Sequence, residues 1–524
     1  MTKYQPSAKP LKALLAVEPL PTVHSESEFR LFLRQLDHQL EQLEQAKTQL
    51  EWAKKWRESY VSTLQAQIEQ AGDMLRTAEG HETIKTWKDR VDDPAIRRWA
   101  EVMDWQFTLA RIEQQPDLRQ IDNYISDRYV QWRPYINGQE VSYIQQTWIL
   151  RHEADRAKRR TAWMALWELG DELQSATRDM FHLRNENARA LGYATYADLK
   201  LEADGVSRQW LVALIEEMER VTAPVFAGYL AQQAEKERLP NVQPWDIQYL
   251  FDQDPWPQPR YFPASGLYDN LMNCVTALGL PASELQQTIR VYWYDSPYGG
   301  QCVTYAPGDI RILTNQGDGM LYYHTAYHEY GHALHSLHYD QPFSLRREAG
   351  IFTEGMAQFM ALFLHYPSWL RRTGLPNDEI ERYRNTRKLP WIYRHRRIAA
   401  DVTAELAVWD EPARDFNQLY GQTTSRYLGT EFQPRPFAAV PRWTHPVQLQ
   451  SYFIADLIST QTHAFLRSNF APIFGRPEAV AHVREHYWQP GNAVPWLEKV
   501  RRCTGEPLSY RALGIEMTQP LPDF

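Results

Sequence analysis

The sequence contains little of what marks secreted or membrane-spanning proteins. Only three of its 524 residues are cysteines, Cys274, Cys302 and Cys503, and they are scattered along the chain. Three scattered cysteines make no disulfide framework, which suits a reducing compartment. No run of about 18 apolar residues occurs, so we expect no membrane span.

A signal peptide and an excess of positive charge are also missing. The opening residues, M-T-K-Y-Q-P-S-A-K-P, lack the long apolar stretch of a secretory signal, so we expect a cytoplasmic protein. Lys and Arg total 57 against 65 Asp and Glu, which gives a formal net charge of -8. Without a basic field, nucleic acid is not an expected partner. No feature of the sequence points to a particular oligomeric state.

Helical patterns dominate what is present, beginning after a lead-in over residues 1–24 that carries four prolines. Ser25 and Glu28 form an S-x-x-E capping box, which predicts the start of a helix. The apolar residues that follow have heptad spacing, which predicts a long amphipathic helix. They are Phe29, Leu33, Leu36, Leu40, Leu43 and Leu50.

Two further helices are expected before residue 115. One covers Trp56 to Leu75, and another begins at Asp93-Pro94, which is a good pair for the N-cap and first helical position. Residues 25–115 are therefore expected to form a helical arm that packs on the body of the protein. The alternative is a coiled coil that recruits a partner.

Residues 116–524 are expected to form one helical domain with one small sheet. Residues 116–235 keep a helical pattern, and helices resume from about residue 320. Between them, I-R-V-Y-W-Y at 289–294 alternates like a strand, with two short neighbours near 301–305 and 309–313. The fold class predicted is mainly α, with its sheet beside the stretch described next.

Three histidines and a glutamate lie within Y-H-E-Y-G-H-A-L-H-S-L, residues 327–337. His328 and His332 are four residues apart, so a helix places both imidazoles on one face, where they can share one zinc ion. Glu329 follows the first histidine and is free to hold a water molecule. This is the H-E-x-x-H arrangement of metallopeptidases. The alternative is a histidine-rich surface helix with no chemistry.

Several residues compete for the place of third metal ligand. His335 lies about 10 Å along the helix from His328, so we expect it to pack or to form a hydrogen bond. His338 would need a helix break that the sequence does not provide. Glu354 opens an otherwise apolar helix, where a carboxylate needs a partner, and a zinc ion would supply one. Its rival Glu348 follows two arginines, and we expect it to form a surface ion pair.

These motifs resemble those of known zinc peptidases. H-E-Y-G-H-A-L-H, S-L-R-R-E-A-G-I-F-T-E and Y-F-I-A-D-L-I-S look like angiotensin-converting enzyme and its bacterial relatives. E-G-M-A-Q, P-W-D-I-Q-Y and L-R-N-E-N-A-R-A-L-G-Y look equally like the thimet oligopeptidase and oligopeptidase F group. Both groups are gluzincins with a two-lobed helical fold and a deep central channel. The specific matches cover roughly residues 300–465, and the first 115 residues match weakly.

The resemblance implies roles for particular residues of this chain. It makes His328, His332 and Glu354 the ligands of one zinc ion, with Glu329 as general base and then acid. It also implies that His445 and Tyr452, in W-T-H-P-V-Q-L-Q-S-Y-F, stabilise the oxyanion. For Tyr452 the alternative is an ordinary core aromatic at helical spacing. By the same analogy, the arm would cover the channel and exclude folded proteins.

The chain departs from the converting-enzyme pattern at several positions. Gln358, one turn after Glu354, stands where those enzymes have an aspartate, and we expect it to orient a ligating histidine. Ser451 replaces their chloride-binding arginine. Trp443 stands in place of the lysine that grips the substrate carboxylate, with Arg442 as the neighbouring substitute. The interval from His445 to Tyr452 is also three residues shorter.

The sequence therefore predicts a zinc metallopeptidase that hydrolyses short oligopeptides. One exposed strand is expected to pair with the substrate backbone, although an ordinary edge strand is the alternative. It comprises Gln301, Cys302, Val303, Thr304 and Tyr305. A dipeptidyl carboxypeptidase is the alternative within the enzyme class. Outside it, the alternatives are an inactive peptide-binding or scaffold protein and an adaptor with a structural metal.

Overall fold

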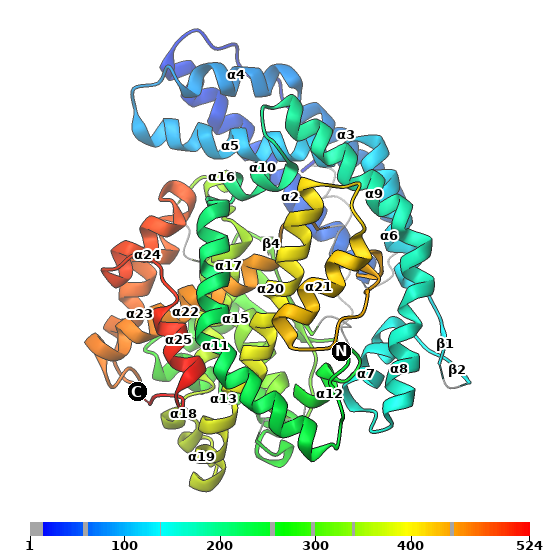
Figure 1. The fold of residues 1–524 in the computed structure, drawn as a ribbon. Helices are drawn as coiled ribbons and strands as arrows, with labels where there is room; N and C mark the ends of the chain where they lie inside the picture. Colours follow the sequence, from blue (N-terminus) through cyan, green and yellow to red (C-terminus); the bar gives the residue numbers. More distant parts are fainter. Residues whose placement is uncertain are drawn as a thin grey trace. The chain divides into compact units, whose positions relative to one another are not determined.

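The computed structural model describes residues 14–55, 61–136, 138–251, 257–294, 299–337, 341–440 and 445–523. His338, Arg442 and Trp443, which the sequence singled out, lie outside these residues. The described chain is mostly helical with two small sheets (Figure 1), which confirms the predicted mainly-α class. Among the described residues, none of the helices combines the length and the apolar character that a membrane crossing would need.

The chain divides into two compact units, each built from three separate stretches. The first comprises Met1–Arg111, Phe262–Leu364 and Phe465–Pro507, and the second comprises Ile112–Tyr261, His365–Ala464 and Leu508–Phe524. We call them unit 1 and unit 2.

The elements of unit 1 are mostly helices around one three-stranded sheet. They are α2 (Glu26–Lys55), α3 (Val61–Leu75), α4 (Ala78–Lys88), α5 (Pro94–Glu113), η2 (Ala264–Gly266), α13 (Leu267–Ala277), α14 (Ala282–Thr288), β3 (Ile289–Trp293), β4 (Gly300–Ala306), β5 (Asp309–Thr314), α15 (Met320–Leu337), α16 (Phe343–Arg346), α17 (Gly350–Phe363), α23 (Pro477–Val483), the π-helix η5 (Arg484–Trp488), η6 (Gly491–Ala493) and α24 (Trp496–Thr504).

Unit 2 contains longer helices and one two-residue hairpin. Its elements are α6 (Pro116–Gln131), β1 (Tyr135–Ile136), β2 (Gln139–Glu140), α7 (Tyr143–His152), α8 (Arg156–Met164), α9 (Leu166–Ala190), α10 (Tyr196–Ala203), α11 (Arg208–Lys236), α12 (Ile247–Phe251), η1 (Pro259–Tyr261), α18 (Pro367–Arg372), α19 (Asn377–Thr386), α20 (Lys388–Asp410), α21 (Phe416–Leu428), η3 (Phe437–Ala439), the greater part of α22 (Leu449–Phe470) and α25 (Arg511–Thr518).

Local capping explains where the helices of the arm begin. The N–H of Glu28 donates to Ser25 Oγ over 3.3 Å, and the Glu28 carboxylate accepts the N–H of His24 over 2.8 Å, so α2 starts at the expected box. The carboxylate of Asp93 accepts the N–H of Ala95 over 2.8 Å at the start of α5. The predicted long helix and the predicted start at Asp93-Pro94 are both confirmed.

The arm helices bury a continuous apolar cluster within unit 1. The heptad residues of α2 lie in it together with residues of α3, α4 and α5, and Leu345 of α16 joins them. The carboxylate of Asp37 accepts the N–H groups of Phe343 over 2.6 Å and of Ser344 over 2.8 Å. These contacts fix the arm to the short helix that leads into α17.

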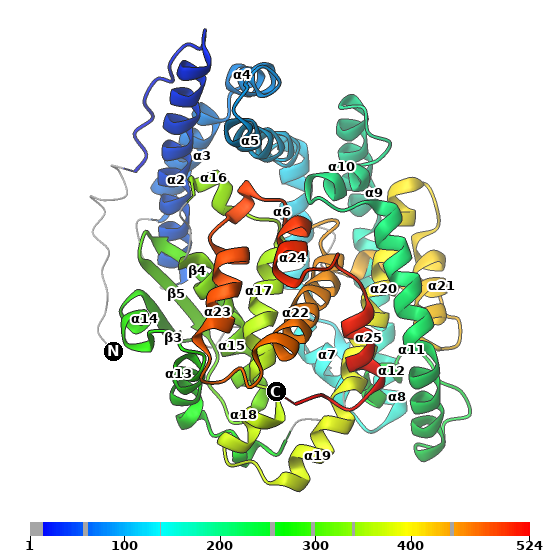
Figure 2. The ribbon, with the colours of Figure 1, turned by 90° about the vertical axis from the view of Figure 1, so that its left-hand side faces the viewer.

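The small sheet has the order β3-β5-β4, so β4 is an edge strand. β3 runs parallel to β5, and β4 runs antiparallel to it with Cys302 opposite Ile312. The C-terminal part of α2 lies beside this sheet (Figure 2), where Trp52 meets Tyr292 edge-on at 5.0 Å between ring centroids. All three predicted strands are confirmed within a residue or two.

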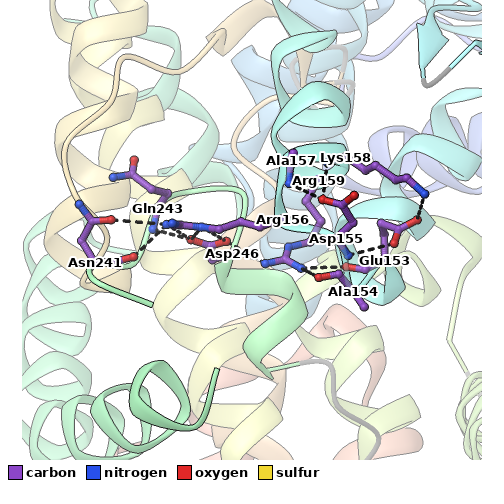
Figure 3. A network of polar contacts seen from close by, with 10 residues as sticks. All are labelled: Glu153, Ala154, Asp155, Arg156, Ala157, Lys158, Arg159, Asn241, Gln243 and Asp246. Carbon is purple, nitrogen blue, oxygen red and sulfur yellow. Dashed lines mark hydrogen bonds and ion pairs between the residues drawn. The ribbon is translucent and has the colours of Figure 1, made fainter. Parts of the chain in front are cut away.

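In unit 2, the P-W-D-I-Q-Y motif forms a buried ionic anchor (Figure 3). The fully buried carboxylate of Asp246 pairs with Arg156 at 2.8 Å and with Arg159 at 2.9 Å. It also accepts the N–H of Gln243 over 3.0 Å. Because a buried carboxylate needs such partners, this motif joins the start of α8 to the segment before α12.

Candidate metal centre

Helix α15 carries the two histidines of the H-E-x-x-H motif on one face. The ring centroids of His328 and His332 lie 5.0 Å apart, and each side chain is about one-fifth exposed. The four-residue spacing produces this arrangement because it advances the helix by roughly one turn. Burial lowers the pKa of His332 to about 3, so its imidazole is neutral at neutral pH, the form that binds a metal.

Glu354 reaches the same point from the neighbouring helix α17. Its Oε2 lies 3.3 Å from His328 Nε2, and its Oε1 lies 3.9 Å from His332 Nε2. One ligand atom from each of the three residues lies within 4.8 Å of the others. Two imidazole nitrogens and a carboxylate oxygen fit zinc, and a set of three leaves the open fourth position typical of catalytic sites.

The close approach of α15 and α17 depends on Gly331, inside the motif itself. A Cβ at this position would lie 2.7 Å from Ala357 Cα and 2.7 Å from the carbonyl oxygen of Met356. Both contacts are to backbone, which cannot turn aside as a side chain can. The absence of a side chain at Gly331 therefore lets α17 bring Glu354 up to the histidines. This role of Gly331 was not predicted from the sequence, although a glycine inside a helix with apolar neighbours was the available signal.

Glu329 lies buried between α15 and the start of β4. Burial raises its pKa to about 7, and the neighbouring Glu354 adds to the rise while His328 opposes it. A Cβ on Gly300 would lie 2.6 Å from Glu329 Cγ and 2.7 Å from Oε1, so a larger residue there would displace the Glu329 side chain. The base predicted from the sequence is thus a carboxyl group whose pKa lies near neutral pH and which interacts electrostatically with His328.

Alternate residues of the edge strand β4 face opposite sides of the sheet. Gly300 and Cys302 are directed to the α15 side, where burial and the nearby Glu329 raise the pKa of the Cys302 thiol. On the other side, Gln301 accepts a hydrogen bond of 2.5 Å from Lys55 at the end of α2. The expected role of residues 301–305 in holding substrate remains a prediction.

Glu348 is not the surface residue that the sequence suggested. Its side chain is only 2% exposed and pairs with His335 Nε2 at 2.8 Å and with Lys499. The two arginines before it instead pair with α2, where Arg346 meets Glu41 at 2.9 Å and Arg347 meets Glu44 at 3.6 Å. The prediction failed because the true partners lie elsewhere in the sequence. For His335, the predicted hydrogen bond is confirmed.

The remaining predicted residues occupy α17 and unit 2. Gln358 is buried on α17, one turn beyond Glu354. In unit 2, His445 is exposed just before α22, and Tyr452 lies in the first turn of α22, its ring 6.0 Å below the guanidinium of Arg394. Their predicted roles, like those of the metal ligands and Glu329, stay predictions.

The backbone after His445 has an unusual conformation that the sequence did not reveal. Val447 has φ of 55°, which is rare for a β-branched residue. The buried carboxylate of Glu405 accepts its N–H over 2.7 Å, and the Gln450 side chain donates to its carbonyl oxygen over 2.5 Å. Such strain clusters at functional sites, so this turn fits a positioned His445.

One comparison with known proteins bears on this chain. Residues 149–263 match the model of peptidase family M3. That gluzincin family includes enzymes of the thimet oligopeptidase and oligopeptidase F type, so the match confirms the resemblance to that group. It lies outside residues 300–465, where the specific motifs were placed from the sequence. The matched stretch holds the Asp246 anchor of unit 2. No curated protein matches the chain.

Proposed function

We propose that this chain, which the match to peptidase family M3 indicates is a zinc metallopeptidase, hydrolyses short oligopeptides with one zinc ion per chain. The observation that carries this proposal is the convergence of His328, His332 and Glu354 within 4.8 Å, with the buried Glu329 beside them. Zinc bound there supplies a Lewis acid that polarises the scissile carbonyl and acidifies the attacking water.

Glu329 performs the proton transfers. As a carboxylate it accepts a proton from the attacking water, and as a carboxylic acid it returns that proton to the leaving amine. A pKa near 7 supports both roles, because neither protonation state is then strongly disfavoured. The absence of a side chain at Gly300 leaves room for the Glu329 carboxyl group beside β4.

His445 and Tyr452 donate hydrogen bonds to the oxyanion of the tetrahedral intermediate. An imidazole and a phenol are suitable donors, and a preorganised donor stabilises charge that develops only during reaction. The edge strand β4 pairs with the substrate backbone, because its outer edge offers N–H and C=O groups to an added strand.

The first test is product analysis by mass spectrometry. Purified protein is incubated with a mixture of peptides of roughly 5–20 residues, half with amidated C-termini, with and without a chelator. We expect internal cleavage in both halves that stops when the chelator is present. Dipeptides released only from peptides with a free C-terminus would instead identify a dipeptidyl carboxypeptidase.

Glu329→Gln tests the general base apart from metal binding. Removal of the proton acceptor is expected to lower kcat by about 10²–10⁴-fold. Because Glu329 is not one of the three ligands, the variant should still bind one zinc ion, measured by elemental analysis. Glu354→Gln is the matched comparison, and this variant should lose both peptidase activity and zinc binding. A fully active Glu329→Gln protein would contradict the mechanism, whereas zinc-loaded wild type without any cleavage would favour a peptide-binding protein.

A further inference from the structure

A buried ionic network lies directly behind the metal centre within unit 1. Glu348 is its centre: Oε2 accepts from His335 Nε2 over 2.8 Å, and Oε1 accepts from Lys499 Nζ. The three side chains are between 0 and 2% exposed. Burial alone would raise the pKa of Glu348, but Lys499 and His335 bring it below the ordinary value, so the carboxylate is charged.

Two members of the network lie on or just before the helices that carry the metal ligands. His335 lies three residues after His332 on α15, and Glu348 lies six residues before Glu354, just ahead of α17. The hydrogen bond between them therefore joins the end of one ligand helix to the start of the other. The contact at Gly331 joins the same two helices nearer their middle.

Lys499 comes from α24, more than a hundred residues later in the chain. Its ammonium group lies 3.6 Å from the ring centroid of Phe352, two residues before Glu354, and donates to the carbonyl oxygen of Tyr487 over 3.0 Å. Tyr487 belongs to the π-helix η5, in which the N–H of Gln489 bonds to Arg484 five residues back. Such helices recur at functional sites.

We propose that Glu348 and Lys499 are positioning residues that fix α15 against α17 and thereby determine how tightly the site retains zinc. This inference rests on the proposed function, since it assumes that His328, His332 and Glu354 are the ligands. The ion pair acts through geometry: if it is lost, the start of α17 is no longer held against α15, and Glu354 no longer meets both histidines at once. Groups that orient metal ligands from behind typically contribute about 10–100-fold in metal affinity.

The test is a measurement of zinc affinity on folded protein, with no dependence on catalysis. Lys499→Met, Glu348→Gln and the double variant are titrated against a chromophoric chelator, and circular dichroism gives the folded fraction of each. The double variant guards against misfolding, because it leaves neither charge buried without its partner. We expect all three to bind zinc about 10–100-fold more weakly per folded molecule. The visible spectrum of the cobalt-loaded protein should change as well, since it reports the ligand geometry.

The arm supplies a matched control in the same unit. His81, Asp104 and Lys88 form a second histidine–carboxylate–lysine group, with His81 at 2.7 Å from Asp104 and Lys88 at 2.5 Å. Asp104→Asn combined with Lys88→Met removes the same kinds of charge from α4 and α5. It should lower the unfolding free energy and leave zinc affinity unchanged.

Two results would overturn the proposal. If the Glu348 and Lys499 variants unfold more easily but bind zinc as tightly as wild type, the ion pair only stabilises the fold. If the double variant alone recovers wild-type affinity, the loss in the single variants came from an unpaired charge and not from lost positioning. Wild type that binds no zinc would reject the proposed function too, whereas wild type that binds zinc and cleaves peptides leaves that function standing in either case.

Discussion

At the scale of single residues, the geometry of the metal centre depends on a glycine, Gly331, as much as on the three ligands. Gly331→Ala would place a methyl group against the backbone of Met356 and Ala357. We expect the variant to lose about 1–3 kcal/mol of unfolding free energy, because the helices must separate to admit the methyl group. Zinc affinity should fall with it, since Glu354 moves away from the histidines. Urea unfolding and zinc titration measure the two effects.

Gly350→Ala is the matched control for that substitution. Gly350 begins α17, and nothing lies within 4 Å of a Cβ built there. Removing conformational freedom from the unfolded chain at an unstrained position stabilises by about 0.4–1 kcal/mol, so this variant should be neutral or more stable. Equal behaviour of the two alanine variants would show that the close contact at Gly331 is unimportant.

The individual residues differ in how far the sequence could identify them. His328 and His332 were predictable because a helix converts their spacing directly into proximity. Glu354 was predictable because a carboxylate on an apolar helix needs a partner. Glu348 was misassigned because its adjacent arginines suggested a local pair, while Lys499 lies far along the chain. Neighbouring residues in the sequence are a good guide to local contacts. They give little information about contacts between residues that are far apart in the chain.

At the scale of elements, two helix starts in the arm and all three strands of the main sheet could be predicted. Ser25 with Glu28, and Asp93 with Pro94, mark helix starts through bonds within one turn. The π-helix η5 and the strained turn at Val447 could not be predicted. Both are stabilised by groups from distant segments, Lys499 in the first case and Glu405 in the second.

The Asp246 anchor of unit 2 provides a prediction at this scale. Asp246→Asn leaves Arg159, which is 2% exposed, without its charged partner. Breaking a buried pair in this way typically costs about 3–5 kcal/mol, so the variant should unfold at a much lower urea concentration. Glu153→Gln is the control from the same network, because Glu153 and Lys158 are 3.7 Å apart and their side chains are 29% and 48% exposed. That change should cost less than about 1 kcal/mol.

The arm helices α4 and α5 provide a pH-dependent prediction. Burial raises the pKa of Asp104, but hydrogen bonds from His81 and Lys88 lower it below the ordinary value overall. The folded state therefore binds fewer protons than the unfolded state, and the stabilisation is complete above about pH 4, the unfolded value. Asp104→Asn should be less stable than wild type at neutral pH. The difference should shrink as the pH falls through the folded-state pKa.

Urea unfolding followed by circular dichroism at a series of pH values measures this difference. The control is Asp93→Asn, whose pKa is also lowered, mainly by the N–H of Ala95, but at a solvent-exposed N-cap. A stability difference for Asp104→Asn that grows on acidification would contradict the assigned direction of the shift.

At the scale of the whole molecule, zinc should stabilise the protein without being required for its fold. The buried residues of α17 are almost all apolar, and its backbone contacts α15 closely at Gly331, so the two helices are expected to associate without metal. Free zinc at about 100 times its Kd should add about 2.7 kcal/mol to the unfolding free energy. A chelator should therefore lower Tm while the far-ultraviolet dichroism at low temperature stays unchanged. Loss of helical signal on chelation would show that the metal is structural.

The boundaries of the two units were the feature that the sequence predicted least well. Each unit takes three stretches of chain, and the boundaries at residues 112, 262, 365, 465 and 508 carry no common signal of composition. Linkers rich in glycine or proline reveal domains that follow one another, but here the stretches of the two units alternate along the chain. Contacts between segments that are distant in the sequence leave no signal in local sequence patterns.

The discontinuity of unit 1 has a consequence for how the protein is made. A ribosome releases His328, His332 and Glu354 long before it reaches Lys499, and synthesis of that interval takes roughly 7–30 s. During this time the nascent chain holds the three ligands but not the lysine that pairs with Glu348. From the proposed role of the ion pair we therefore expect tight metal binding only after the C-terminal segment has joined the helices that were translated before it.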